Sequence, residues 1–190
     1  MELNDFPPEL VHQAMQNASP DEKFHLQTIF DELNKRERRQ RCQNDFLEYV
    51  KSQWPDFISG AHHRRIARLF EDIAAGRKKR VIINLGPRHT KSEFASFHLP
   101  SWFMGKFPKK KVLEVSNTAE LAEGFGRKVR NQLDTPEYAE IFPDVSLRAD
   151  SKAAGRWNTN KGGEYYATGV NAPLAGRGAD LAIIRSEEHT

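Results

Sequence analysis

Residues 81–93 read VIINLGPRHTKSE, and this stretch decides which fold the chain is expected to adopt. Its first five residues are mostly apolar, as expected of a strand that is buried on both faces of a sheet. A polar loop and a helical pattern follow. The order then repeats, because three lysines lead into an apolar run at residues 112–116 and a second helical pattern. Strands that alternate with helices predict an α/β domain with a largely parallel sheet.

The loop within this stretch is compared first with the common phosphate-binding pattern. That pattern has the form G-x-x-x-x-G-K-S/T and lies between a strand and a helix. Lys91 and Ser92 fit its last two positions, whereas Leu85 and Thr90 stand where its glycines belong. The chemistry can survive these changes, because backbone N–H groups and the start of a helix attract an anion. From the residues alone, nucleotide binding and an ordinary strand–turn–helix connection both remain open.

If the loop binds a nucleotide, its side chains have distinct tasks. Lys91 supplies a positive charge to the β- and γ-phosphates, and Ser92 ligates Mg²⁺ through its hydroxyl. Arg88 can reach the γ-phosphate and stabilise charge in the transition state. Arg88 and Lys91 are therefore the candidate catalytic residues, Ser92 is the candidate metal ligand, and ATP and Mg²⁺ are the expected ligands. The candidate binding residues are Gly86, Pro87, Arg88, His89, Thr90, Lys91, Ser92 and Glu93.

Composition narrows the class of protein. The chain has 190 residues and a formal net charge of +3, which suits one domain with a mild preference for anionic partners. Its single cysteine, Cys42, excludes an internal disulfide framework and favours a reducing cytoplasm. No stretch has the apolar length that a membrane span needs, and the N-terminus lacks the layout of a signal peptide. We therefore expect no membrane partner.

Residues 1–42 are interpreted as a leader followed by a helix. Ser19, Pro20 and Glu22 predict the start of that helix, because together they can form a capping box with proline in the first turn. The helix runs into a basic stretch at residues 35–41, which we interpret as a solvated helix end. A contact of that stretch with DNA or with a partner is the alternative. Two shorter helices are expected next, near residues 45–53 and 62–75.

The string NLGPRHTKSEFAS, with LPSWFMGKFP after it, resembles the ATPase domain of the large terminase subunit of tailed bacteriophages. That family carries a variant loop of the form P-P-R-H-G/T-K-S-E. Gly86 departs from its first proline, and Thr90 lies within its variation. The resemblance continues in the same order through VLEVSNTAELAEGFGRKVRNQL, IFPDVSL, GGEYYATGV and LAGRGADLAII, and it covers roughly residues 45–184.

The resemblance implies a P-loop NTPase fold of the RecA-like (ASCE) type over residues 43–184, preceded by the N-terminal helical segment. It implies a motor that hydrolyses ATP to package double-stranded DNA into the procapsid. Such a motor works as a homo-oligomeric ring on the portal protein, together with the small terminase subunit, in the host cytoplasm. Lys91 and Ser92 would grip the triphosphate and Mg²⁺, and Arg88 would act as an arginine sensor or finger in cis.

The resemblance also assigns roles outside the loop. The segment around Trp54, Phe57, His62 and His63 lies where the family places adenine contacts. For either histidine alone we favour local hydrogen bonds at a helix start, and adjacent histidines without a cysteine pair argue against a zinc site. Arg177, between two glycines, can sense a nucleotide from a neighbouring subunit, touch DNA or simply be an exposed loop residue.

The end of the chain departs from the family. There the strand matching residues 179–184 continues into Asp-Asp-Pro, whose first acid holds Mg²⁺, whereas here Arg185 follows and would repel the metal. Glu187 lies roughly 6–7 Å further along an extended chain. Our hypothesis is that residues 185–190 are a non-native tail on an ATPase domain incomplete at its C-terminus, because RSEEHT can be encoded by the start of a common sequencing adapter. The nuclease domain of the family is absent from this sequence, and we expect poor ATP hydrolysis.

Two other functions remain open. A helicase-like RecA ATPase shares the fold class, although the Arg88-His89 loop type argues against it. A non-catalytic nucleic-acid-binding module with a degenerate loop would suit the basic runs at residues 35–41, 77–80 and 109–111. Such a module should be indifferent to ATP, and a purely structural protein should bind neither ATP nor DNA.

Overall fold

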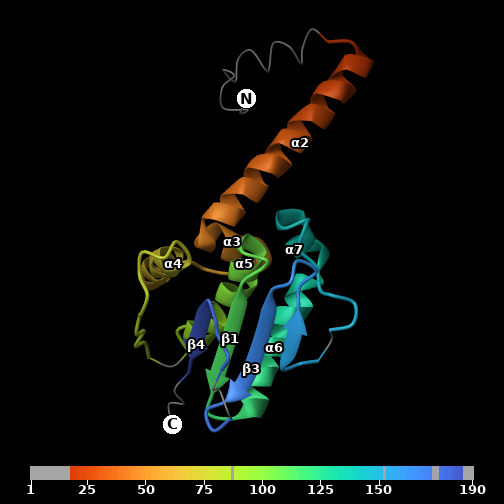
Figure 1. Ribbon diagram of the computed structural model, residues 1–190. Helices are drawn as coiled ribbons and strands as arrows, with labels where there is room; N and C mark the ends of the chain where they lie inside the picture. Colours follow the sequence, from red (N-terminus) through yellow and green to blue (C-terminus); the bar gives the residue numbers. More distant parts are fainter. Residues whose placement is uncertain (1–17, 87, 152, 173–175, 186–190) are drawn as a thin grey trace.

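The structure is a computed structural model that describes residues 18–86, 88–151, 153–172 and 176–185. A long helix, α2 (Pro20–Asn44), projects from a body in which helices surround a small sheet (Figure 1). The helices of the body are α3 (Phe46–Gln53), α4 (Ala61–Ala74), the π-helix η2 (Glu93–His98), α5 (Leu99–Lys106), α6 (Ala119–Leu133) and α7 (Pro136–Ile141). The strands are β1 (Lys111–Ser116), β2 (Arg156–Asn158), β3 (Glu164–Gly169) and β4 (Leu181–Ile184).

The sheet confirms the predicted α/β class with largely parallel pairing. Its strand order is β2-β3-β1-β4, so the last strand along the chain lies at one edge. β1 pairs in parallel with both β3 and β4, whereas β2 pairs with β3 in the antiparallel sense. Because β1 and β4 are parallel, their carboxyl ends reach the same edge of the sheet.

The predicted start of the first helix is also confirmed. Ser19 accepts a hydrogen bond from the Glu22 backbone, the Glu22 carboxylate accepts one from the Ser19 backbone, and Pro20 is the first residue of α2. α4 ends where it was predicted to end, because Gly76 follows it with a left-handed φ of 73°. Glycine adopts this conformation without the penalty that a Cβ would bring.

The strand predicted at residues 81–85 is wrong, because these residues have no regular secondary structure. Ile82 is 88% exposed, and a groove lies between this segment and β4, with Val81 and Ile83 on one wall and residues 181–185 on the other. A strand needs a partner for its backbone N–H and C=O groups. Among the described residues β4 pairs only with β1, so residues 81–85 have no partner strand.

An aromatic core fixes the helices around the sheet. The Phe46 ring meets the rings of Phe70, Phe94 and Trp102 edge-on, at centroid distances of 5.3, 5.6 and 5.5 Å. Edge-to-face packing at these distances is favourable. The Trp102 indole N–H donates to the Cys42 backbone oxygen at 3.0 Å, which ties the end of α2 to α5. The helix that follows the candidate loop is therefore anchored through Phe94.

Only the last turns of α2 pack against the body. The Gln43 side chain donates to the Ile141 backbone oxygen, and Arg39 donates to that of Glu140. Near its start the helix is open, with Phe24 72% exposed and Ile29 54% exposed. In the part of the chain that the structure describes, no helix combines the length and the apolarity that crossing a membrane requires.

Glu114 is an unusual residue of the sheet. It lies in the middle of β1, fully buried between Ala167 and Ile183 on the neighbouring strands. Neither of its carboxylate oxygens has a hydrogen-bond partner among the described residues. Burial raises the pKa of Glu114 to about 8, opposed by the nearby Ser96 hydroxyl and the Arg185 charge. At neutral pH this side chain is therefore mostly protonated.

Ionisation of Glu114 should make the folded chain less stable as pH rises. We expect Glu114→Gln to abolish this pH dependence. Between the ordinary pKa of 4.5 and the folded value of about 8, the folded chain holds more protons than the unfolded chain, so stability falls as pH rises through this window. Each pKa unit is worth about 1.4 kcal/mol, so the loss amounts to several kcal/mol at most. Melting temperatures near pH 5 and near pH 8 measure it.

The exposed Glu137→Gln is the matched control, and its melting temperature should follow that of the unsubstituted chain at both pH values. If Glu114→Gln does the same, the carboxyl is ionised in the folded protein and our assignment of its charge is wrong.

Candidate functional site

The predicted phosphate-binding loop lies at the carboxyl edge of the sheet. It precedes η2, and Ser92 at its end is in contact with Arg185, which follows β4 directly. In open α/β sheets, ligands bind outside the carboxyl ends of the strands. The loop therefore occupies the position at which a ligand site is expected.

The backbone of the loop is left-handed at two positions that are not glycine. Arg88 has a φ of 63° and Thr90 a φ of 58°. For a β-branched residue such as Thr90 this conformation is a genuine outlier, worth on the order of 1–3 kcal/mol of strain. Left-handed residues beside helical ones turn successive N–H groups to one side, which is the arrangement of an anion-binding nest. Such a backbone persists only where surrounding contacts hold it.

His63 supplies one of these contacts from α4. The Gly60 backbone N–H donates to His63 Nδ1 at 2.9 Å, so the proton of the neutral ring sits on Nε2. Nε2 lies 2.7 Å from Thr90 Oγ1 and donates to it, and this hydroxyl donates in turn to the His89 backbone oxygen at 2.6 Å. A chain of three hydrogen bonds thus runs from the start of α4 to the strained position of the loop.

The surroundings keep His63 neutral and fixed. Its ring packs against those of Phe57 and Phe94, with centroids 4.8 and 5.0 Å away. Burial lowers the pKa of His63, and the neighbouring His62 and His89 lower it further. The favoured sequence interpretation, a local hydrogen bond at the helix start, is confirmed by the bond from Gly60. The bond to Thr90 was missed, because no local pattern links residues 27 positions apart.

Lys91 and Ser92 both face the groove beside β4, together with Arg185. The Lys91 ammonium donates to the Leu85 backbone oxygen at 3.3 Å. Arg185 Nη2 donates to Ser92 Oγ at 3.1 Å, and the same guanidinium lies 4.5 Å from the centre of the Phe125 ring. A guanidinium this close to Ser92 does not fit a magnesium ion, since like charges repel. The positive charges of Lys91 and Arg185 suit a phosphate group instead.

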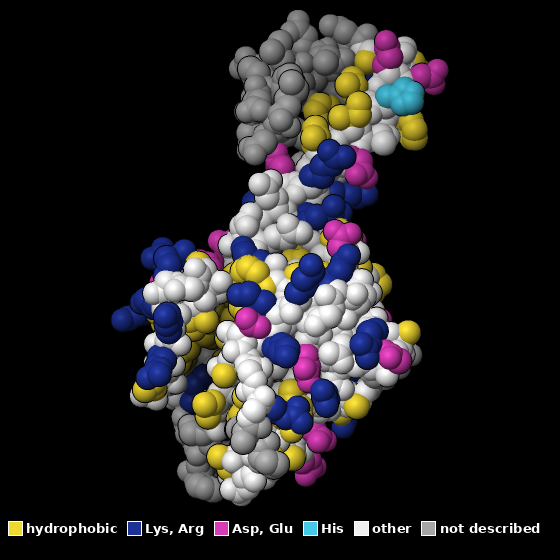
Figure 2. All heavy atoms as spheres, in the orientation of Figure 1, with side chains coloured by type: hydrophobic (Ala, Val, Ile, Leu, Met, Phe, Trp, Pro, Cys, Tyr) yellow, Lys and Arg dark blue, Asp and Glu magenta, His cyan; other side chains and the backbone are white. Residues whose placement is uncertain are grey.

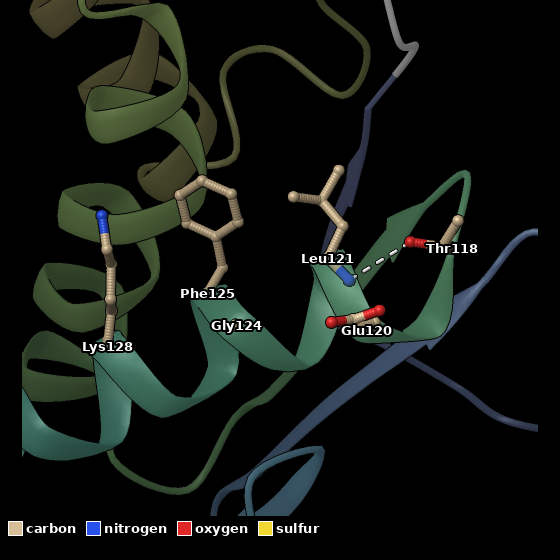
Figure 3. Close-up of a pocket in the computed structure, with 6 residues that line it drawn as sticks. All are labelled: Thr118, Glu120, Leu121, Gly124, Phe125 and Lys128. Carbon is tan, nitrogen blue, oxygen red and sulfur yellow. Dashed lines mark hydrogen bonds between the residues drawn. The ribbon is translucent and has the colours of Figure 1, made fainter.

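Glu93 points toward α6. Its carboxylate pairs with the Lys128 ammonium at 2.9 Å. Lys128, Phe125 and Leu121 project from α6 beside a shallow pocket that Thr118, Glu120 and Gly124 complete (Figure 3). The carboxylate of Glu93 is therefore paired with a lysine of α6.

The structure places the remaining predicted residues, those of the loop and Arg177, as follows. The His89 ring covers Gly86, where an added Cβ would lie 3.4 Å from it, and Arg88 is exposed. The Arg177 guanidinium stacks at 4.0 Å on the ring of Tyr166 in β3. Pro87 lies outside the described residues. So do most of the predicted leader, residues 1–17, and residues 186–190 of the predicted tail.

Comparisons with protein-family models, with curated proteins and with solved structures found no match to this chain. A proposal about its function therefore depends on its own residues and their geometry.

The contact between His63 and Thr90 can be measured by a double-mutant cycle. We expect His63→Ala and Thr90→Val to destabilise the chain non-additively, with a coupling free energy of about 1 kcal/mol, because each removes one end of the same hydrogen bond. Valine keeps the branched shape of Thr90. Chemical denaturation of the four proteins gives the coupling.

His62→Ala is the control for this cycle, since His62 neighbours His63 without bonding to Thr90. Its effect should add to that of Thr90→Val. Additivity for His63→Ala as well would show that the side chain does not hold the loop.

Proposed function

We propose that the loop at residues 86–92 binds the triphosphate of ATP and that the chain is the ATPase part of a phage terminase large subunit. The observation that carries the proposal is the meeting of Ser92 with the end of β4. Ser92 Oγ and Arg185 Nη2 are 3.1 Å apart. The side chain that follows β4 and the hydroxyl that follows Lys91 therefore lie in direct contact. In P-loop ATPases these two positions act on one nucleotide.

The charges around the loop support an anionic ligand. Lys91 lies beside Ser92 in the groove, and Arg88 is exposed in the same loop, while Glu93 is paired with Lys128. The backbone adds left-handed positions and the start of a helix, both of which favour a phosphate group. Lys91 would act as a point charge on the β- and γ-phosphates, and Arg88 would stabilise charge on the γ-phosphate.

The wider function follows from the family resemblance of the sequence. As part of a terminase, the chain would work in a homo-oligomeric ring docked on the portal protein, would cooperate with the small terminase subunit in the host cytoplasm, and would move double-stranded DNA into the procapsid. The helicase-like ATPase and the non-catalytic nucleic-acid-binding module are the competing functions. The proposed function requires ATP binding, whereas the non-catalytic nucleic-acid-binding module does not.

Binding of ATP tests the proposal directly. We expect Lys91→Ala to weaken binding of a fluorescent ATP analogue by about tenfold or more, because a charge-assisted contact to phosphate is worth about 1.5–3 kcal/mol. Lys161→Ala, at an exposed lysine of the β2–β3 turn, is the control and should bind as the unsubstituted chain does. Equal binding by all three proteins, or none, would favour the nucleic-acid-binding module.

Substitution of Arg185 tests whether the end of β4 is the position of the metal-binding acid. Because the guanidinium does not suit a cation, we expect the unsubstituted chain to bind ATP with little dependence on Mg²⁺ and to hydrolyse it poorly. Arg185→Asp replaces the cation with a carboxylate near Ser92, so Mg²⁺ should then raise ATP affinity by about tenfold, the scale of one good charged contact.

Arg185→Gln removes the same positive charge without adding a carboxylate, and it should gain little from Mg²⁺. Identical behaviour of the two variants would argue against this placement of the acid. Robust magnesium-dependent turnover by the unsubstituted chain, lost in Lys91→Ala, would show that Arg185 does not block the metal.

A further inference from the structure

The helix α4 has two faces of opposite character. Its inner face packs into the core, and its buried residues are His63, Ile66, Ala67, Phe70 and Ala74. Its outer face carries Arg64, Arg65 and Arg68, and all three are exposed. Residues three and four apart lie side by side on a helix, so the three guanidiniums share one stripe.

This arrangement does not stabilise the helix. Arg64 and Arg65 lie in the first two turns, near the positive end of the helix dipole, where cations are unfavourable. Arg64 and Arg68 are like charges at a spacing of four residues, which is also unfavourable. Among the described residues, no carboxylate forms an ion pair with any of the three arginines. Helix formation therefore does not explain why three arginines stand here.

The positive charge continues beyond α4. Residues 77–80 read RKKR and are all exposed, and Lys78 joins the three arginines in lining one shallow groove. Asp72 also lines this groove, but its carboxylate is engaged by Arg77 at 2.7 Å and by Lys78 at 3.8 Å.

The concentration of charge is high for this chain. Residues 61–80 contain seven Lys and Arg against Glu71 and Asp72, a net charge of +5, whereas the whole chain carries only +3. The remainder of the chain is therefore net negative. Figure 2 shows Lys and Arg side chains gathered on the side of the body where α4 lies.

We propose that this α4 basic surface, formed by Arg64, Arg65, Arg68 and residues 77–80, binds the phosphate backbone of a nucleic acid without reading its sequence. Arginine forks match phosphate oxygens in a bidentate manner. A row of cations along one helix and its continuation suits a polymer with a negative charge at every repeat. No exposed aromatic residue lies within this surface to stack on a base, so contact is confined to the backbone.

The inference rests on the proposed function in that it names a surface for the double-stranded DNA, but it uses none of the residues of the loop and can fail without the ATP site failing. The competing occupant is an anionic membrane surface, since Ile58 and Ile82, 87% and 88% exposed, lie before and after the basic surface in the chain. Binding of a basic surface to an anionic membrane is strengthened by apolar residues that enter the lipid. The arginine stripe itself has none, which favours the nucleic acid.

The test compares two triple variants with the same net charge. Fluorescence anisotropy of a labelled DNA duplex of random sequence measures affinity between about 50 and about 200 mM salt. One variant is Arg64→Gln/Arg65→Gln/Arg68→Gln. The control is Lys23→Gln/Arg36→Gln/Lys161→Gln, which removes three exposed cations from α2 and the β2–β3 turn. Melting temperatures confirm that both fold.

We expect the arginine variant to bind the duplex about tenfold or more weakly at the lower salt concentration. Its plot of log affinity against log salt should become less steep by about 1 for each phosphate that the variant no longer neutralises. The control should change by less than about threefold, and Lys91→Ala should bind DNA as the unsubstituted chain does, which separates this result from the ATP site.

Three results would overturn the inference. The first is an equal decrease of affinity in both triple variants, which would mean that only net charge matters. The second is absence of duplex binding by the unsubstituted chain at the lower salt. The third is binding of phosphatidylserine-rich vesicles in preference to the duplex.

Discussion

The hydrogen bond between His63 and Thr90 is the contact on which the geometry of the candidate site depends. Thr90 adopts a left-handed backbone that its branched side chain disfavours, and the bond of 2.7 Å from Nε2 ties it to α4. Gly60 fixes the proton on Nε2, and Phe57 and Phe94 fix the ring. A helix buried on one side thus sets the shape of a loop that precedes the next helix.

This bond also connects the two proposed binding regions. α4 presents His63 inward to the loop and three arginines outward, all within residues 63–68. The two proposed binding regions therefore share one helix.

The sequence predicted features that depend on neighbours in the chain. Helix starts such as Ser19 with Glu22 follow from local hydrogen bonds, and the parallel pairing of β1 follows from alternation of strands and helices. The strand at residues 81–85 failed because an apolar pattern cannot reveal whether a partner strand is present. The bond from His63 to Thr90 was not predicted for a related reason, because a contact between residues 27 positions apart produces no periodic pattern in the sequence.

With Arg185 in place after β4, the charges beneath the loop favour an anion over a metal ion. Glu114 lies under η2 close to Ser96 and Arg185, and burial keeps its carboxyl mostly neutral below a pKa of about 8. This buried acid therefore supplies little negative charge, while Arg185 adds a positive one 3.1 Å from Ser92. Arg185 Nη1 is itself buried without a hydrogen-bond partner among the described residues. A cation brought to Ser92 would be repelled by this guanidinium, whereas an anion would be attracted to it.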